Sequence, residues 1–152
     1  TGGGDRAWLN QIQLTFPDLV AEAHDTHHPV DIMAYYDEQK PEAARRAEGF
    51  RKHRIKKFLG WAERVLEHNP SGPDWMVGDR LTYADLSLFQ VVEGLRYAFP
   101  TATARVTKDT PRVIAVRDRV AALPRFQAYL ASPRRIPFNE DGIFRRYPEL
   151  DG

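Results

Sequence analysis

The chain contains 152 residues, a length that predicts one domain with a hydrophobic core of its own. It carries 22 lysines and arginines against 21 aspartates and glutamates, so its formal net charge is only +1. This balance argues against a dedicated nucleic-acid-binding protein, because affinity for the phosphate backbone needs a concentrated excess of positive charge. The absence of cysteine excludes disulfides, thiolate metal sites and cysteine nucleophiles.

The spacing of apolar residues indicates an all-helical domain. They recur every three or four positions along most of the chain, whereas alternation of period two is hard to find. We expect residues 1–6 to form a flexible linker, residues 7–132 the helical domain, and residues 133–152 an extended tail packed on the bundle. No apolar run has the length of a membrane helix or a secretion signal, so we expect a cytoplasmic protein without a membrane partner.

The first helical segment spans about residues 5–37 and contains a proline that must be accommodated. In a helix interior Pro17 would cost roughly 3 kcal/mol. Two solutions stay open, a helix restart with Thr15 as the N-cap residue or one continuous kinked helix. A second segment runs from Pro41 to about residue 68, and the basic face that it presents over residues 45–57 is interpreted as a solvated surface.

The third segment carries the strongest local signal. Thr82 and Asp85 are predicted to form a capping box, in which the Thr82 hydroxyl accepts the Asp85 N–H and the Asp85 carboxylate accepts the Thr82 N–H. The helix that follows, residues 83–99, is apolar on nearly every face. Such a helix is surrounded by others, so we expect it at the centre of a bundle.

Two more helices complete the predicted bundle. Beyond Pro100 we expect a loop as far as Pro111, then helices over about residues 113–124 and 125–131. The predicted fold class is therefore all-α, a bundle of about five helices around a buried central helix.

Two stretches resemble a known family. The run VGDRLTYADL at residues 77–86 resembles the helix-capping motif in the C-terminal domain of cytosolic glutathione S-transferases. The run LPRFQAYLAS at residues 123–132 resembles the closing helix of the same domain. With the order and spacing of the helices, the resemblance covers about residues 7–147, and it implies a bundle of that C-terminal type.

The resemblance implies one half of an enzyme. In that family glutathione is held mainly by an N-terminal thioredoxin-like domain, which also supplies the residue that activates the thiol, and no part of this chain has its βαββα pattern. We therefore expect no catalytic residue here and no transferase activity from this chain alone. For the parent enzyme we expect glutathione as the co-substrate and no cofactor. The parent protein is expected to be a homodimer that conjugates glutathione to small hydrophobic electrophiles in detoxification, this domain providing the electrophile-binding wall and dimer contacts.

The same resemblance suggests residues for ligand binding. A carboxylate early in the first helix can reach the α-amino group of glutathione across the dimer, and Asp18 is the candidate, unless it only caps a helix start. His28 and Tyr35 are expected to shape the electrophile site, with Met33 as a soft apolar neighbour and Phe144 closing over it from the tail. The alternative for the aromatic and methionine side chains is a place in the core or in the dimer interface.

The motif HDTHH at residues 24–28 raises the question of a metal site. His24 and His28 are spaced i, i+4 and could hold one ion, but a third ligand from another helix, such as His53 or His68, would be needed. We interpret these histidines as the wall of a polar cleft and expect no bound metal.

Two other functions remain open from the sequence. Domains of this type are also found attached to translation factors and synthetases, so the chain could be a non-catalytic interaction module that uses its basic face. A metal-dependent thiol transferase on a helical bundle, using the histidines, is the third interpretation.

Overall fold

The computed structural model describes residues 3–152, and over these residues it contains helices and no β-strand. The α-helices are α1 Gly3–His24, α2 Lys40–Gly49, α3 Ile55–Glu67, α4 Tyr83–Ala98, α5 Pro100–Val106, α6 Pro111–Ala121, α7 Pro124–Leu130 and α8 Pro148–Asp151. Shorter segments are the 3₁₀ turns η1 Tyr36–Glu38 and η3 Thr107–Asp109 and the π-helical η2 Phe50–Arg54. The predicted all-α fold is confirmed.

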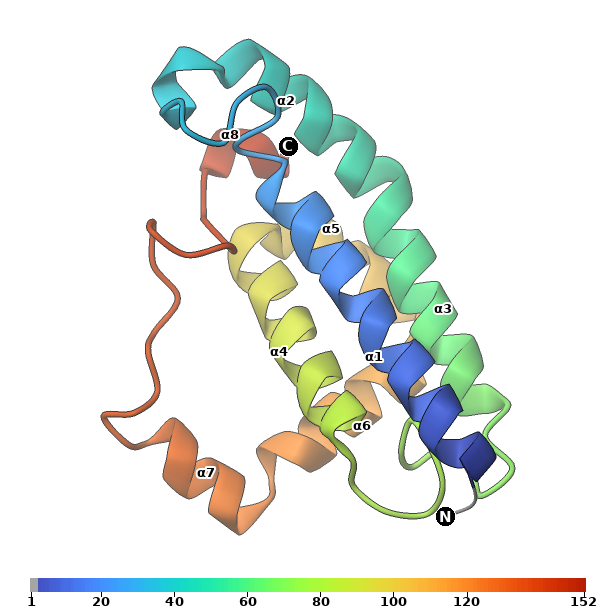
Figure 1. Cartoon of the computed structure of the whole chain (residues 1–152). Helices are drawn as coiled ribbons and strands as arrows, with labels where there is room; N and C mark the ends of the chain where they lie inside the picture. The colour runs from blue at the N-terminus through green and yellow to red at the C-terminus, as the bar shows by residue number, and fades with distance from the viewer. Residues whose placement is uncertain (1–2) are drawn as a thin grey trace.

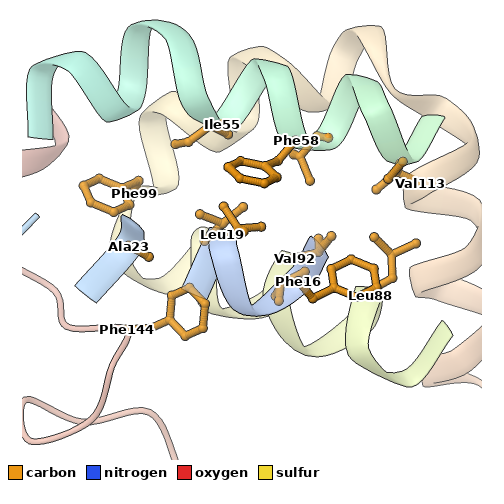
Figure 2. Packing of buried hydrophobic residues seen from close by; sticks show 14 of the residues in the cluster. Phe16, Leu19, Ala23, Ile55, Phe58, Leu88, Val92, Phe99, Val113 and Phe144 are labelled. Atoms are coloured by element: carbon orange, nitrogen blue, oxygen red, sulfur yellow. The ribbon is translucent and has the colours of Figure 1, made fainter. Parts of the chain in front are cut away.

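The central helix of the bundle is α4, as the sequence predicts. It packs against α1, α5 and α6, and Figure 1 shows α1 running beside it. Figure 2 shows Leu19 from α1, Phe58 from α3 and Val92 from α4 pointing into one interior. The first turn of α4 differs from the prediction, because Tyr83 and Leu86 are exposed there.

Pro17 lies inside one continuous helix rather than at a restart. The helix α1 runs unbroken from Gly3 to His24, and the Thr15 hydroxyl donates to the carbonyl of Gln11 at 3.1 Å within it. Residues 3–6, expected to be linker, are helical, whereas residues 1 and 2 lie outside the described residues. The helix ends at His24 and not near residue 37, and turns at residues 25–28 follow before Pro29.

The predicted second segment is observed as α2, η2 and α3 in succession, with a π-helical turn in the middle. Several of its basic side chains are paired with carboxylates. Arg46 lies 3.2 Å from Asp25, and Arg54 makes two hydrogen bonds to the Glu22 carboxylate. These pairs reduce the free positive charge of the basic face.

The predicted loop after Pro100 is wrong, because α5 and η3 occupy it. The side chain of Asp151, from the other end of the chain, accepts the N–H of Thr101 at 2.9 Å and of Ala102 at 3.2 Å. Two orphan N–H groups of the first turn of α5 are satisfied in this way. No local sequence signal announces a cap that comes from about 50 residues away.

The tail follows an irregular path from α7 and runs along the α4 side of the bundle to α8, as Figure 1 shows. Its Phe144 and Leu150 side chains are buried, and α8 contacts α2 and α5. Phe144 lies directly over Gly94 of α4, where any larger residue would overlap its ring. In the described part of the chain, none of the helices has the length and apolar character needed to cross a bilayer.

Candidate functional site

A loop between α1 and α2 forms one side of the candidate site, and the buried side chain of Gln39 organises it. Its Oε1 atom accepts the N–H of Val30 at 2.9 Å and of Asp31 at 3.3 Å. Its Nε2 atom donates to the carbonyl oxygens of Asp31 at 2.9 Å and of Ala34 at 3.0 Å. One side chain therefore satisfies four backbone groups of residues 30–34, in addition to the Ala34 N–H to Asp31 carbonyl bond of the loop itself.

A hollow of about 530 Å³ lies between this loop and the tail. Residues 28–36 contribute mainly apolar and aromatic groups, whereas Asp37, Lys40 and most of the tail residues contribute charged groups. Its lining consists of His28, Ile32, Met33, Ala34, Tyr35, Tyr36, Asp37, Lys40, Glu140, Asp141, Arg145, Tyr147 and Glu149. A hollow that combines apolar and charged groups can hold an apolar group and orient a polar one.

A pair of stacked tyrosines closes the base of the hollow. The rings of Tyr36 and Tyr147 lie 3.9 Å apart at 15°, and the Tyr36 hydroxyl donates to Glu149 at 3.0 Å. Burial and the neighbouring Glu149 carboxylate raise the pKa of the Tyr36 hydroxyl above its ordinary value. Tyr36 is therefore neutral, and its hydroxyl proton is directed at the carboxylate.

Three of the residues singled out by sequence lie together in this hollow. Met33 and Tyr35 are 84% and 80% exposed, and the half-buried His28 lines the same space. Val30 and Ile32 are also largely exposed, so the loop presents several large apolar side chains to water. Large apolar side chains that gather on a surface mark a contact or ligand site more often than a plain surface.

The other two candidate residues lie elsewhere. Phe144 is only 6% exposed and does not line the hollow, since it packs over Gly94 and beside Phe138. Asp18 is exposed on α1 and does not line the hollow either. The structure thus separates Asp18 and Phe144 from His28, Met33 and Tyr35.

The capping residues at the start of α4 do more than the sequence suggests. Thr82 and Asp85 make the reciprocal capping box, with the Thr82 N–H donating to Asp85 Oδ2 at 2.7 Å. The other oxygen, Oδ1, accepts the N–H of Met76 at 2.7 Å, which ties the preceding loop to the helix. Burial raises the pKa of the Asp85 carboxyl, although these donors act in the opposite direction.

The histidines at the end of α1 form a tight cluster, in which His27 joins the i, i+4 pair of His24 and His28. One ring nitrogen from each of His24, His27 and His28 lies within 4.8 Å of the other two. Because α1 ends at His24, residues 25–28 form turns that bring the His27 ring next to both neighbours, at centroid distances of 4.9 and 4.8 Å. His53 and His68, the expected third ligands, are exposed on other parts of the fold.

The His27 side chain is 1% exposed, and its Nδ1 atom is buried without a hydrogen-bond partner. Its Nε2 atom lies 2.8 Å from the carbonyl oxygen of Ile143 in the tail. Burial lowers the pKa of His27 to about 4, and burial together with the neighbouring His28 also lowers the pKa of His24. Both rings are therefore largely neutral at pH 7.

A second, larger hollow of about 730 Å³ lies at the start of α4. It is bounded by the first turns of α1 and by residues 77–83 and Leu86. None of the ligand-binding residues predicted from the sequence lines it.

Sequence reasoning missed Gln39, and it did not predict the partners of Tyr36, Tyr147 and His27, which it considered only as pocket or packing aromatics and as part of the histidine cluster. Each acts through a partner from a segment distant in the chain or from an irregular turn, so neither helical periodicity nor a motif identifies it. The adjacent histidines of HDTHH were the single available signal for His27.

The order of helices and the capped central helix can be compared with known proteins. The family model described as "Glutathione S-transferase, C-terminal domain" matches residues 24–133. The chain belongs to this family. The resemblance inferred from residues 77–86 and 123–132 is thereby confirmed.

Relatives of this C-terminal domain carry two kinds of name. S-crystallin SL11 of Nototodarus sloanii is 29% identical over 110 residues, covering 71% of this chain and 51% of the relative. A glutathione S-transferase of Plasmodium yoelii yoelii is 26% identical over 83 residues, covering 55% of this chain and 37% of the relative. The chain therefore spans about half or less of the length of these two relatives.

A solved structure shares the fold of this domain. The protein named NaGST-2 superposes with a TM-score of 0.59 and 21% identity, over 91% of this chain and 62% of that chain. At that identity the likeness establishes the helical architecture alone.

Proposed function

We propose that this chain is the C-terminal helical half of a glutathione transferase, and that the hollow beside residues 28–40 is its wall for a small hydrophobic electrophile. The observation that carries the proposal is the exposure of Met33 and Tyr35 at one hollow that His28 also lines. A flexible thioether and a flat ring adapt to apolar groups of different shape. The charged tail side of the hollow suits the polar part of such a ligand.

Glutathione is the co-substrate in this proposal, and its thiol is activated by a thioredoxin-like domain outside these 152 residues. A thiol with an ordinary pKa of about 8.5 needs a nearby donor or positive field to react as a thiolate. The buried hydroxyl near the hollow, that of Tyr36, is already engaged with Glu149 and keeps a high pKa. This chain would then contribute binding and positioning of the electrophile, which accelerate a reaction by proximity.

The proposal extends to Asp18 and to the assembly. The Asp18 carboxylate is exposed on α1 and available to the α-amino group of glutathione bound by a second copy in a homodimer. The parent protein would act in detoxification in the cytoplasm.

Selective labelling of methionine methyl groups tests the electrophile wall, because the chain contains two methionines in opposite environments. Met33 lies in the hollow, whereas Met76 is fully buried. On titration with 1-chloro-2,4-dinitrobenzene, we expect the Met33 methyl signal to shift and the Met76 signal to stay. Tyr35→Ala should weaken this binding, and Tyr83→Ala, an exposed tyrosine at the larger hollow, is the matched control. Shifts at Met76 alone, or equal effects of both variants, would contradict the assignment.

Activity of the isolated chain provides a separate test. Family membership does not fix the activity, since relatives are named both S-crystallin and glutathione S-transferase. We expect no conjugation of glutathione to 1-chloro-2,4-dinitrobenzene above the uncatalysed rate. Turnover by highly purified chain, lost in Tyr35→Ala, would show that the thiol-activating group lies within these residues.

A further inference from the structure

Two of the three clustered histidines are oriented by backbone carbonyls, so that each keeps one ring nitrogen with a free lone pair. The His27 Nε2 atom lies 2.8 Å from the carbonyl oxygen of Ile143. A carbonyl can only accept, so Nε2 carries the ring proton and Nδ1 carries the free lone pair. That Nδ1 atom is buried and has no protein partner.

His28 is oriented by the same kind of contact. Its Nδ1 atom lies 3.1 Å from the carbonyl oxygen of Ala34, which places the proton on Nδ1 and leaves the Nε2 lone pair free. The Gln39 amide nitrogen, 3.4 Å from His28 Nδ1, already donates to the carbonyls of Asp31 and Ala34. Histidines that bind metals are usually held in this way, with the second nitrogen donating to a backbone carbonyl or a carboxylate.

We propose that His24, His27 and His28 form a binding site for a divalent first-row transition-metal ion, with Zn²⁺ as the expected occupant. Neutral imidazole is a preferred ligand of zinc, copper and nickel, whereas Ca²⁺ and Mg²⁺ prefer oxygen. The orphaned Nδ1 of the buried His27 is the observation that points to a ligand, because buried polar atoms without a partner are rare in native proteins. The site adjoins the proposed electrophile wall, and His28 belongs to both.

Binding requires a small movement of two side chains. Ligand nitrogens about 2.1 Å from a tetrahedral zinc ion are roughly 3.4 Å apart, closer than the 4.8 Å observed. His27 is fixed by burial and by Ile143. The half-buried rings of His24 and His28, which stack with centroids 5.0 Å apart, would both have to turn toward it, and for His28 this means adjusting its contact with Ala34. Three protein ligands leave one coordination position for water or for a ligand group in the adjoining hollow.

The charged groups around the cluster have opposite effects on positive charge at the histidines. Asp25 favours positive charge at His24, but its carboxylate is also paired with Arg46. Arg145, from the tail, disfavours positive charge at both His24 and His27. A divalent cation bound at these rings would be repelled by the same Arg145 charge. Removing the Arg145 charge should therefore strengthen metal binding. If the histidines only supported the fold, the same substitution would not increase zinc affinity.

Calorimetry with zinc chloride on the full 152-residue chain, prepared without a histidine tag and stripped with a chelator, tests the proposal. We expect one zinc ion per chain. His24→Gln and His28→Gln should each lower the affinity at least about 100-fold, a larger loss than removal of a residue that only orients a metal ligand. His53→Gln and His68→Gln are the matched controls and should bind as the wild type does. Arg145→Gln should bind several-fold more tightly. His27 is not replaced, because its side chain is buried and a substitution there would destabilise the fold as well as remove a ligand.

Cobalt provides a second readout that does not depend on heat. Tetrahedral Co²⁺ absorbs visible light far more strongly than hexa-aquo Co²⁺, so the wild type should give an intense visible band that both His24→Gln and His28→Gln abolish. The absence of saturable zinc binding at 100 µM, or equal losses in the His53 and His68 variants, would overturn the proposal. Binding that Arg145→Gln weakens would also overturn it, because the predicted repulsion would then be absent.

Discussion

Replacement of Asp85 by alanine should destabilise the fold more than removal of the helix cap alone. The Asp85 carboxylate accepts the buried N–H of Met76 through Oδ1, and the N–H and hydroxyl of Thr82 through Oδ2. A buried N–H without an acceptor costs about 1–3 kcal/mol. Loss of the cap adds about 1 kcal/mol. We therefore expect Asp85→Ala to lower the free energy of unfolding by about 3 kcal/mol.

Thr82→Ala separates the two contributions. It removes the capping hydroxyl but leaves both carboxylate oxygens of Asp85 in place, so it should cost only about 1 kcal/mol. Asp85→Asn keeps the shape of the side chain but directs an N–H₂ group at one of the two sets of donors. Because of that mismatch, its cost should be close to that of Asp85→Ala.

Urea unfolding followed by circular dichroism at 222 nm measures these differences. A domain of ordinary stability, about 5–15 kcal/mol, stays folded after a loss of this size, so all variants can be compared. The m-value should be the same for each variant if the native state is unchanged. Equal costs for Asp85→Ala and Thr82→Ala would refute the reasoning, because the bond to Met76 would then contribute nothing. An Asp85→Asn variant as stable as the wild type would refute it as well.

Two further substitutions test long-range contacts. In Gly94→Ala the new methyl group would lie 2.5 Å from Cγ and Cε2 of Phe144, so the ring must leave its site. Loss of most of the Phe144 burial should cost about 1.5–3 kcal/mol, with faster hydrogen exchange in residues 133–147. The Glu63 carboxylate accepts the backbone N–H groups of Arg112 and Val113 at 3.1 and 3.0 Å. Glu63→Ala should therefore cost about 2–4 kcal/mol in urea unfolding and raise hydrogen exchange in the first turn of α6.

Each of these variants has an internal control. Gly60→Ala changes another helical glycine, whose new methyl group would only make ordinary contact with Arg64, so it should not expose the tail. Glu67→Ala removes a neighbouring exposed carboxylate that pairs with the Arg112 side chain at 3.5 Å, where we expect a loss of at most about 1 kcal/mol. Unchanged exchange in the tail of Gly94→Ala, or equal costs for Glu63→Ala and Glu67→Ala, would contradict the respective prediction.

Features that depend on neighbouring residues could be predicted from the sequence. The all-α class and the buried middle of α4 follow from apolar periodicity, which reports the face that a helix buries. The cap of α4 was also predicted correctly, because Thr82 and Asp85 are three residues apart and satisfy each other's backbone groups. These residues lie within the run that carries the family resemblance.

Features that depend on contacts between distant residues could be found only in the tertiary structure. The first turns of α5 and α6 are satisfied by Asp151 and Glu63, each about 50 residues away, so residues 100–110 read as a loop from the sequence although they are mostly helical. Likewise His27 joins its neighbours only because α1 ends at His24 and the tail carbonyl of Ile143 fixes its ring. Local periodicity carries no information on such pairings, because the free energy of a buried polar group depends on which partner the fold brings to it.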